Sequence, residues 1–218
     1  MSRVRTPDRA LRNHCFWRHK SVGGGDFFLY FLCIFILPFA YIFQKRRDKH
    51  MHLFIRRKDI PYILLTILLG CIFHFLYDFS EQNPFTALIA PVNESVWEHL
   101  KLLFFPIFIS TIIQYYVIKP MPTAYFGSRL AGVWGGMSSI VILFYMYTAF
   151  LGSHLLLIDL LIFIFSILLS FYISARFYHA FWNIDYFTVF FSWLFSILLF
   201  FAFTCFPPNL TIFYPPQK

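Results

Sequence analysis

The sequence predicts an all-α membrane protein, a helical bundle with about six transmembrane helices. Of its 218 residues, 59% are hydrophobic and only 13% are charged, whereas soluble domains carry about a quarter charged residues. The apolar residues come in long blocks, and a bilayer core about 30 Å thick needs roughly 20 such residues per helix. Lipid is therefore the solvent in which we expect this chain to fold, as a multi-pass protein of the cell membrane.

The predicted spans follow from six apolar blocks. None of them alternates between polar and apolar residues, and all exceed the length of about 9–11 residues typical of a transmembrane β-strand. The blocks run Phe27–Phe43, Ile60–Phe79, Leu102–Ile118, Leu130–Leu151, Leu155–Ala175 and Phe187–Phe206. The first is the shortest and contains Pro38, so a re-entrant segment is an alternative there. We expect a basic tail at 1–25, one transmembrane domain at 26–213 and a short tail at 214–218.

The positions of Lys and Arg predict the orientation. The loop after the first block contains seven of them, namely Lys45, Arg46, Arg47, Lys49, Arg56, Arg57 and Lys58. The loop after the third block contains Lys119 and Arg129, and Arg176 follows the fifth, while residues 80–99 and 152–154 contain none. The positive-inside rule then places the first, third and fifth loops in the cytoplasm. The basic N-terminal tail disagrees with this pattern, which leaves the inverted orientation open.

The net charge of +8 does not indicate nucleic-acid binding, because no recognition motif accompanies it. Residues 45–58 are instead expected to contact anionic lipid headgroups. Inside the blocks, Gly132 and Gly136 form a small-xxx-small pair, and Ser166, Ser170 and Ser174 follow one helix face. Small residues of this kind allow close helix packing in lipid.

Ionisable residues inside membrane spans are costly, so each is a candidate functional residue. His74 and Asp78 are four residues apart near the end of the second block, which puts them on one face of a helix. His74 would lie roughly 7 Å inside the outer end of that span. A local hydrogen bond between these two side chains is an equally good interpretation.

A second candidate segment, Pro91-Val92-Asn93-Glu94-Ser95-Val96-Trp97-Glu98-His99-Leu100-Lys101, leads into the third block. Asn93 suits a helix N-cap, and Glu98 can pair with Lys101. Trp97 suits the headgroup region. On a helix, Glu94, Glu98 and Lys101 would share a face that could meet water, whereas His99 would turn about 100° away from Glu98, toward the bundle.

The third candidate segment is the start of the fifth block, with His154 and Asp159. Their spacing does not put them on one helix face, so we do not expect a simple pair, although both could border a cavity. An ordinary interfacial histidine is the more frequent role for a residue such as His154.

Together these segments predict a metal site at one membrane face. His74, His99 and His154 are the candidate metal ligands, and Glu98, Asp78 and Glu94 are the candidate catalytic carboxylates. Three protein ligands with an open position for water are typical of catalytic zinc, and such a site could hydrolyse a lipid-like ester, amide or phosphoester. The spacing matches neither HExxH nor HxxEH. A transporter, an ion-binding protein or an accessory subunit of a membrane complex is the alternative.

Two strings, His74-Phe75-Leu76-Tyr77-Asp78 and Pro91–Leu102, resemble a family of uncharacterised bacterial integral membrane proteins, a domain of unknown function. The ending Phe203–Phe213 is similar to the close of that family, and the resemblance runs from about Ile60 to Phe213. It implies a bacterial multi-pass membrane protein and carries over no assigned site residues.

Overall fold

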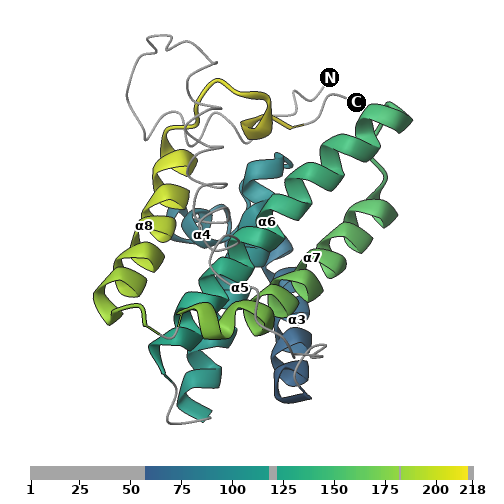
Figure 1. Ribbon diagram of the computed structural model, residues 1–218. Coiled ribbons are helices and arrows are strands. Elements are labelled where there is room, and N and C mark those ends of the chain that lie inside the picture. The colour runs from purple at the N-terminus through teal and green to yellow at the C-terminus, as the bar shows by residue number, and fades with distance from the viewer. Residues whose placement is uncertain (1–56, 118–121, 182, 216–218) are drawn as a thin grey trace, which may run out of the picture.

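The computed structural model describes residues 57–117, 122–181 and 183–215, and within them the protein is an all-α bundle without strands (Figure 1). The predicted first span and the tail at 1–25 lie outside the described residues, as does nearly all of the basic loop. The long helices are α3 (Ile60–Phe79), α5 (Val96–Val117), α6 (Thr123–Leu151), α7 (Leu156–Phe177) and α8 (Tyr186–Cys205). A short helix α4 (Pro84–Ile89) and three 3₁₀ turns, η1 (Arg57–Asp59), η2 (Tyr178–Phe181) and η3 (Thr211–Phe213), complete the described chain.

The five long helices are each long and apolar enough to cross a membrane. The prediction of apolar helices at the last five blocks is therefore confirmed, with two changed boundaries. α5 begins at Val96 rather than Leu102, and α6 begins at Thr123 rather than Leu130. The early turns of α5 and α6 contain charged side chains that are buried and paired inside the bundle. A hydropathy pattern assigns such charged residues to a loop.

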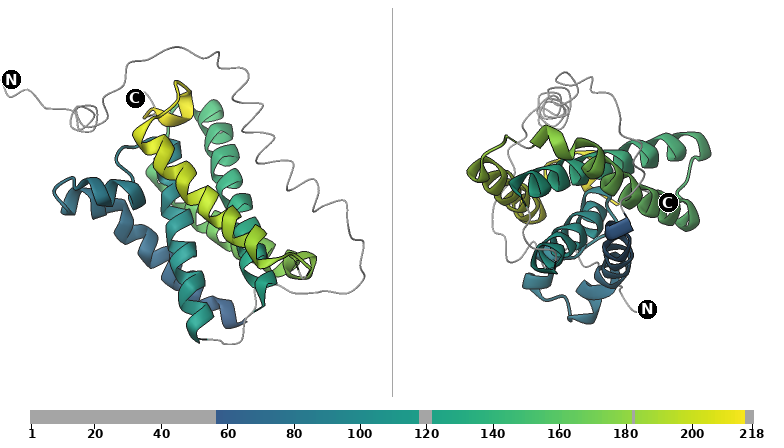
Figure 2. Two further views of the ribbon diagram at one scale, coloured as in Figure 1. Left: turned by 90° about the vertical axis from the view of Figure 1, so that its left-hand side faces the viewer. Right: turned by 60° about the horizontal axis from the view of Figure 1, so that its bottom comes forward.

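The long helices form two closely packed pairs, α3 with α5 and α6 with α7 (Figures 1 and 2). In the second pair the small residues predicted for packing meet each other. A Cβ atom on Gly136 would lie 2.8 Å from the Ser166 carbonyl oxygen, and one on Gly132 would lie 3.1 Å from the Ser170 carbonyl carbon. Ser139 and Ser166 also share a hydrogen bond of 2.7 Å between α6 and α7. The small residues thus set the close approach of this pair.

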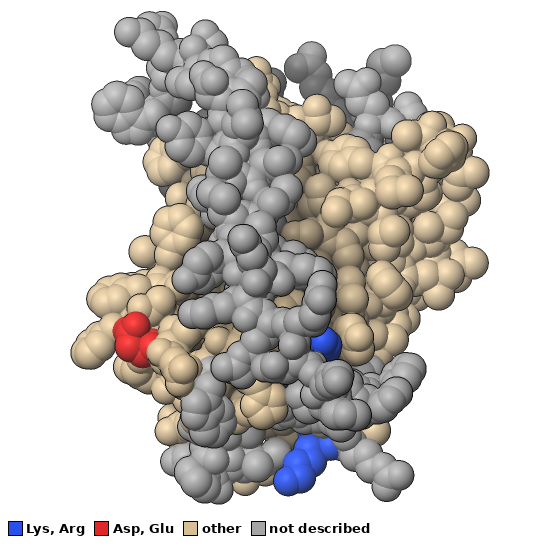
Figure 3. Space-filling view, in the orientation of Figure 1, with Lys and Arg blue, Asp and Glu red and all other residues tan. Residues whose placement is uncertain are grey.

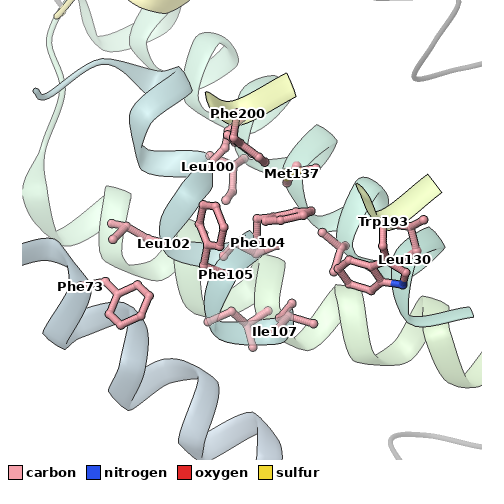
Figure 4. Close-up of a cluster of buried hydrophobic side chains, with 14 of the residues drawn as sticks. Phe73, Leu100, Leu102, Phe104, Phe105, Ile107, Leu130, Met137, Trp193 and Phe200 are labelled. Carbon is pink, nitrogen blue, oxygen red and sulfur yellow. The ribbon is translucent and has the colours of Figure 1, made fainter. Parts of the chain in front are cut away.

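An aromatic core joins α8 to α5 (Figure 4). The ring of Phe104 lies 4.8 Å from that of Phe200 and 5.6 Å from that of Trp193. Trp97 is fully buried at the upper end of this core, with its ring 5.0 Å from Phe213. Trp97, expected at the headgroup region, is shielded inside the protein because the C-terminal turn η3 folds back and covers it.

A buried polar cluster links the helices at the end of the bundle where α3 and α6 begin. The Arg129 guanidinium on α6 donates to Asp59 at 2.6 Å and to Gln114 of α5 at 2.9 Å. Gln114 also donates to Asp59 at 2.9 Å, and Tyr125 donates to Gln114. Arg129 is therefore a residue of α6 and not the loop cation expected from the sequence. Its charge is balanced by a carboxylate from a distant part of the sequence.

Candidate metal centre

The order of the helices brings the predicted site segments to one end of the bundle. α3 ends, α5 begins, α6 ends and α7 begins at this end, because successive helices of the bundle run in alternating directions. The segments 80–95 and 152–155 are the two connections there. We call this the site end, and the end with the Asp59–Arg129 pair the opposite end.

A cavity of about 340 Å³ lies at the site end, between the α3–α5 pair and the α6–α7 pair. Its polar lining side chains are His74, Glu94, His99, His154 and Asp159. The remaining lining side chains are apolar apart from one cysteine, Cys71, and include Phe75, Leu102, Ile140, Phe144 and Phe163. The cavity therefore combines a few polar side chains with an otherwise apolar lining, as ligand sites commonly do.

Three of these side chains come close enough to hold one metal ion. His74, Glu94 and His99 each offer a ligand atom, and the three atoms all lie within 4.8 Å of one another. The imidazole rings of His74 and His99 have their centroids 5.5 Å apart. Two of the three predicted metal ligands are thus neighbours, and Glu94, predicted as a catalytic carboxylate, joins them.

His99 is oriented by the first turn of its own helix. Its Nδ1 lies 2.9 Å from the Ser95 carbonyl oxygen, and its Nε2 lies 3.3 Å from Glu94 Oε2. An Nδ1–H donated to a backbone carbonyl fixes the ring and leaves Nε2 for the ligand, which is the usual outer-shell arrangement of metal-binding histidines. Without a metal, both ring nitrogens face acceptors, so the ring is set up to hold two protons.

His74 contributes a nitrogen with no partner among the described residues. Its Nδ1 is buried and makes no hydrogen bond there, although buried polar atoms are nearly always satisfied. The expected local bond to Asp78 does not form, since Asp78 is exposed and does not line the cavity. His74 instead turns toward His99 on the neighbouring helix.

Glu94 lies just before α5, where the chain bends into the helix. Its side chain is 72% exposed, and the hydrogen bond with His99 lowers the pKa of its carboxyl group, with the nearby charges of His99, His74 and His154 acting in the same direction. Glu94 is therefore held as a carboxylate, the form that binds a metal.

His154 and Asp159 form a second group on the other wall of the cavity. His154 Nδ1 lies 3.6 Å from Asp159 Oδ2, and the Tyr147 hydroxyl donates to Asp159 Oδ1. The expectation that these two residues are not a simple pair was wrong. α7 begins at Leu156, so His154 is in the preceding loop, where helical spacing does not apply. The structure does not place His154 in the three-residue cluster.

Glu98 occupies a different environment from the cavity. It forms a buried ion pair of 2.7 Å with Lys101 and accepts from the Val92 backbone N–H at 3.0 Å and from the Thr204 hydroxyl at 3.2 Å. The expected pair with Lys101 is confirmed, but the expectation that this face could meet water was wrong. Lys101 is fully buried and also donates to the Ala87 carbonyl at 2.8 Å.

Two residues that position side chains at the site end were not predicted from the sequence. Ser95, rather than Asn93, caps α5, because the Glu98 N–H donates to the Ser95 hydroxyl at 3.3 Å while Asn93 accepts from the Ser95 N–H at 2.9 Å. The string Ser95-Val96-Trp97-Glu98 is a serine followed three residues later by glutamate, a known signal of helix starts. Tyr147, which holds Asp159, gave no comparable signal.

The cluster has the composition of a catalytic metal site. Two imidazoles and one carboxylate are a ligand set that proteins use for zinc, with a fourth position left for water. Apolar side chains enclose the site on one side. The exposed side chains of Glu94 and His154 border it on the other. The pair of His154 and Asp159 adds a group able to carry protons beside it.

Comparison with known proteins gives one match. No curated protein and no solved structure matches the chain significantly. Residues 42–216, which include every described helix, match one protein family. The chain thus belongs to the family described as "Family of unknown function (DUF6512)".

Proposed function

We propose that this protein is a multi-pass membrane enzyme whose cluster of His74, Glu94 and His99 binds a divalent metal such as zinc. With this metal, the enzyme hydrolyses a lipid-like substrate at the outer face of the cell membrane. The observation that supports it most is the meeting of three ligand-type side chains, from two helices and a loop, at the polar end of an apolar cavity.

Membrane insertion is supported by the surface of the bundle. The outward side chains of the long helices are large and apolar, such as Leu64 and Leu68 on α3 and Phe190 and Phe191 on α8. The face in Figure 3 shows few charged side chains over the described part of the chain. Water would leave such a surface unstable, whereas lipid solvates it.

The metal proposal is supported by the state of each ligand. His99 presents Nε2 because Nδ1 faces the Ser95 carbonyl, His74 has a buried nitrogen without a hydrogen-bond partner among the described residues, and Glu94 is held as a carboxylate. A cation bound among the three side chains would take one ligand atom from each of them. Binding would displace the proton from His99 Nε2, so metal uptake is expected to release protons.

The chemistry follows from the fourth metal position. A metal held by His74, Glu94 and His99 would act as a Lewis acid and would activate a water for attack on the carbonyl or phosphoryl centre of the substrate. The bond to the leaving oxygen or nitrogen then breaks, and that atom takes up a proton. His154, beside Asp159 at 3.6 Å, is the group we assign to receive the first proton and return it. Glu94 acts in this scheme as a ligand, while Asp78 and Glu98 have no contact with the cavity.

Transport through the bundle has less support. The polar residues that a path could use are bonded inside the protein, since Gln114 binds Asp59 and Arg129, and Ser138 and Ser139 donate to backbone carbonyls of α6. These bonds account for the side chains as packing groups, so hydrolysis is the function we put forward.

The test is metal-dependent hydrolysis by the full chain in phospholipid vesicles. Three probes cover the bond types: a long-chain p-nitrophenyl ester, a fluorogenic long-chain amide and a phospholipid with a reporter headgroup. We expect wild type to cleave at least one when zinc is added, and His99→Ala to lose about 100-fold or more of that rate, since even outer-shell changes at metal sites remove about 10–100-fold. His179→Ala, an exposed histidine in η2 at the opposite end, is the matched control. Equal rates for wild type and His99→Ala with all three probes would contradict the proposal.

A further inference from the structure

The cavity extends from its polar group toward the middle of the bundle. On three of the lining helices, a polar residue near the site end is followed about one turn deeper by a small or apolar one. The pairs are His74 and Gly70 on α3, His99 and Leu102 on α5, and Asp159 and Phe163 on α7. One helical turn is about 5.4 Å, so the polar groups form one layer and the apolar side chains form the next.

Gly70 marks the floor of this apolar layer. A Cβ atom on Gly70 would lie 2.5 Å from Phe163 Cζ and 3.0 Å from the Leu102 carbonyl oxygen. Three helices, α3, α5 and α7, therefore converge closely at this level of the cavity.

At the edge between α3 and α7, several residues that line the cavity are also exposed on the surface of the bundle. These helices belong to different pairs, α3 packing mainly on α5 and α7 on α6. Their lining residues at this edge are surface residues as well: Phe75 is 54% exposed, Leu160 45% and Leu156 82%. Cys71 beside them is also exposed. In a bilayer, the exposed apolar side chains of this edge would face hydrocarbon rather than water.

The size of the cavity favours one chain over two. Its volume of about 340 Å³ is at the lower end of the range of roughly 300–1,000 Å³ for small-molecule sites. A mainly apolar cavity of this volume, with exposed apolar side chains at one edge, suits a single flexible hydrocarbon chain.

We infer that the cavity is a lateral binding site for one acyl chain, which enters between α3 and α7 and lies along the apolar layer with its polar end at His74, Glu94 and His99. This inference rests on the proposed function and specifies its substrate class: a molecule whose hydrolysable bond is at the head of a single long acyl chain. A free fatty acid product and the acyl chain of an intact phospholipid share this chemistry.

Photocrosslinking of the full chain in phosphatidylcholine vesicles tests this inference. One arm uses palmitic acid with a diazirine in mid-chain, and the other uses phosphatidylcholine carrying the same chain, so the arms distinguish the two sources. After illumination, labelled peptides are mapped by mass spectrometry. We expect labels on α3 and α7 around Cys71 and Leu160 to exceed, several-fold, those on the lipid-facing residues of α8 in at least one arm.

A pair of neighbouring substitutions provides the control. Leu160→Trp fills the edge of the cavity and is expected to reduce the α3 and α7 labels several-fold. Leu161→Trp adds the same ring at the next position, which is 58% exposed and does not line the cavity, and is expected to leave them unchanged. Bound zinc is measured in the same preparations, and neither substitution should alter it.

The outcomes separate the two proposals. Labels on α3 and α7 no higher than those on α8 in both arms, or equal labels in the Leu160→Trp and Leu161→Trp variants, would overturn the acyl-chain site even if zinc is bound. Enriched labels in a wild-type protein that binds no zinc would retain the chain site and remove the metal hydrolase.

Discussion

Glu94 and His99 show how the site depends on where a helix begins. Helical spacing would place Glu94 on the face of Glu98, but α5 begins only at Val96. Glu94 is therefore free of the helix and bends back to His99 Nε2 at 3.3 Å. The histidine and carboxylate residue types were predicted from the sequence, whereas this pairing was not, because it depends on a loop conformation.

The Glu94–His99 contact predicts a specific pH dependence in the metal-free protein. The folded-state pKa of Glu94 is below its ordinary value of 4.5. Its contribution to stability is therefore fully present above that value and is lost as the pH falls through the lowered pKa. The exposed position limits the contribution to about 1 kcal/mol or less.

We expect Glu94→Gln to unfold at a lower temperature than wild type above about pH 5, and the gap to close in stronger acid. Thermal unfolding in detergent with a metal chelator measures this difference across pH. A gap that stays constant or widens as the pH falls would show that Glu94 does not stabilise the fold as a carboxylate.

At the scale of elements, the start of α5 is fixed by a buried ion pair. Lys101 joins Glu98 to the carbonyls of Ala87 in α4 and of Ala90 just after it, and Glu98 accepts from the Thr204 hydroxyl on α8. One pair thus ties three helices together at the site end. A charge inside a membrane span indicates function by default, but the buried bonds of Glu98 and Lys101 in α5 support a structural role.

Removing one partner of this pair should be severe. We expect Lys101→Met to destabilise the protein by about 3–5 kcal/mol, because it leaves the Glu98 carboxylate buried and unpaired. The double variant with Glu98→Gln should recover part of that loss. Unfolding of the detergent-solubilised chain by denaturant measures both, and a Lys101→Met variant as stable as wild type would contradict this role.

Hydropathy predicted the five described long helices, including both boundaries of α3, because a long apolar block in lipid has few alternatives to a helix. It missed the first turns of α5 and α6, which contain Lys101 and Arg129. Each of these charges is neutralised by a partner, Glu98 in one case and the distant Asp59 in the other. A hydropathy window sums the values of residues that are neighbours along the chain, so it cannot include a charge partner from another helix.

At the scale of the whole molecule, the alternating helices separate two polar ends. The site end contains His74, Glu94 and His99, and the opposite end contains the Asp59–Arg129 pair. The prediction that the scattered histidines and acids meet at one end was possible from the sequence, since the blocks and their order fix which ends coincide. Which of those residues touch was not, because it depends on helix rotation and loop paths.

The orientation of the bundle predicts the accessibility of the two ends. In a chain with its native cysteines replaced by serine, Ser153→Cys should react with a membrane-impermeant thiol reagent from outside the cell. Asn183→Cys, in the connection from α7 to α8, should react only after the membrane is opened, as the positive-inside rule requires. Reaction of both cysteines from the same side would contradict the alternating spans. Reaction of Asn183→Cys from outside and of Ser153→Cys only after opening would show that the orientation is inverted.

We expect His74, Glu94 and His99 together to bind one metal ion, and the number of zinc ions bound per purified full chain measures this. After purification in mild detergent with zinc and removal of free metal, elemental analysis should find about one zinc per chain in wild type and in His179→Ala. His74→Ala and His99→Ala should be folded and hold almost none. Zinc content that is the same in all four proteins, or zinc absent from wild type, would show that these three residues do not form a metal site.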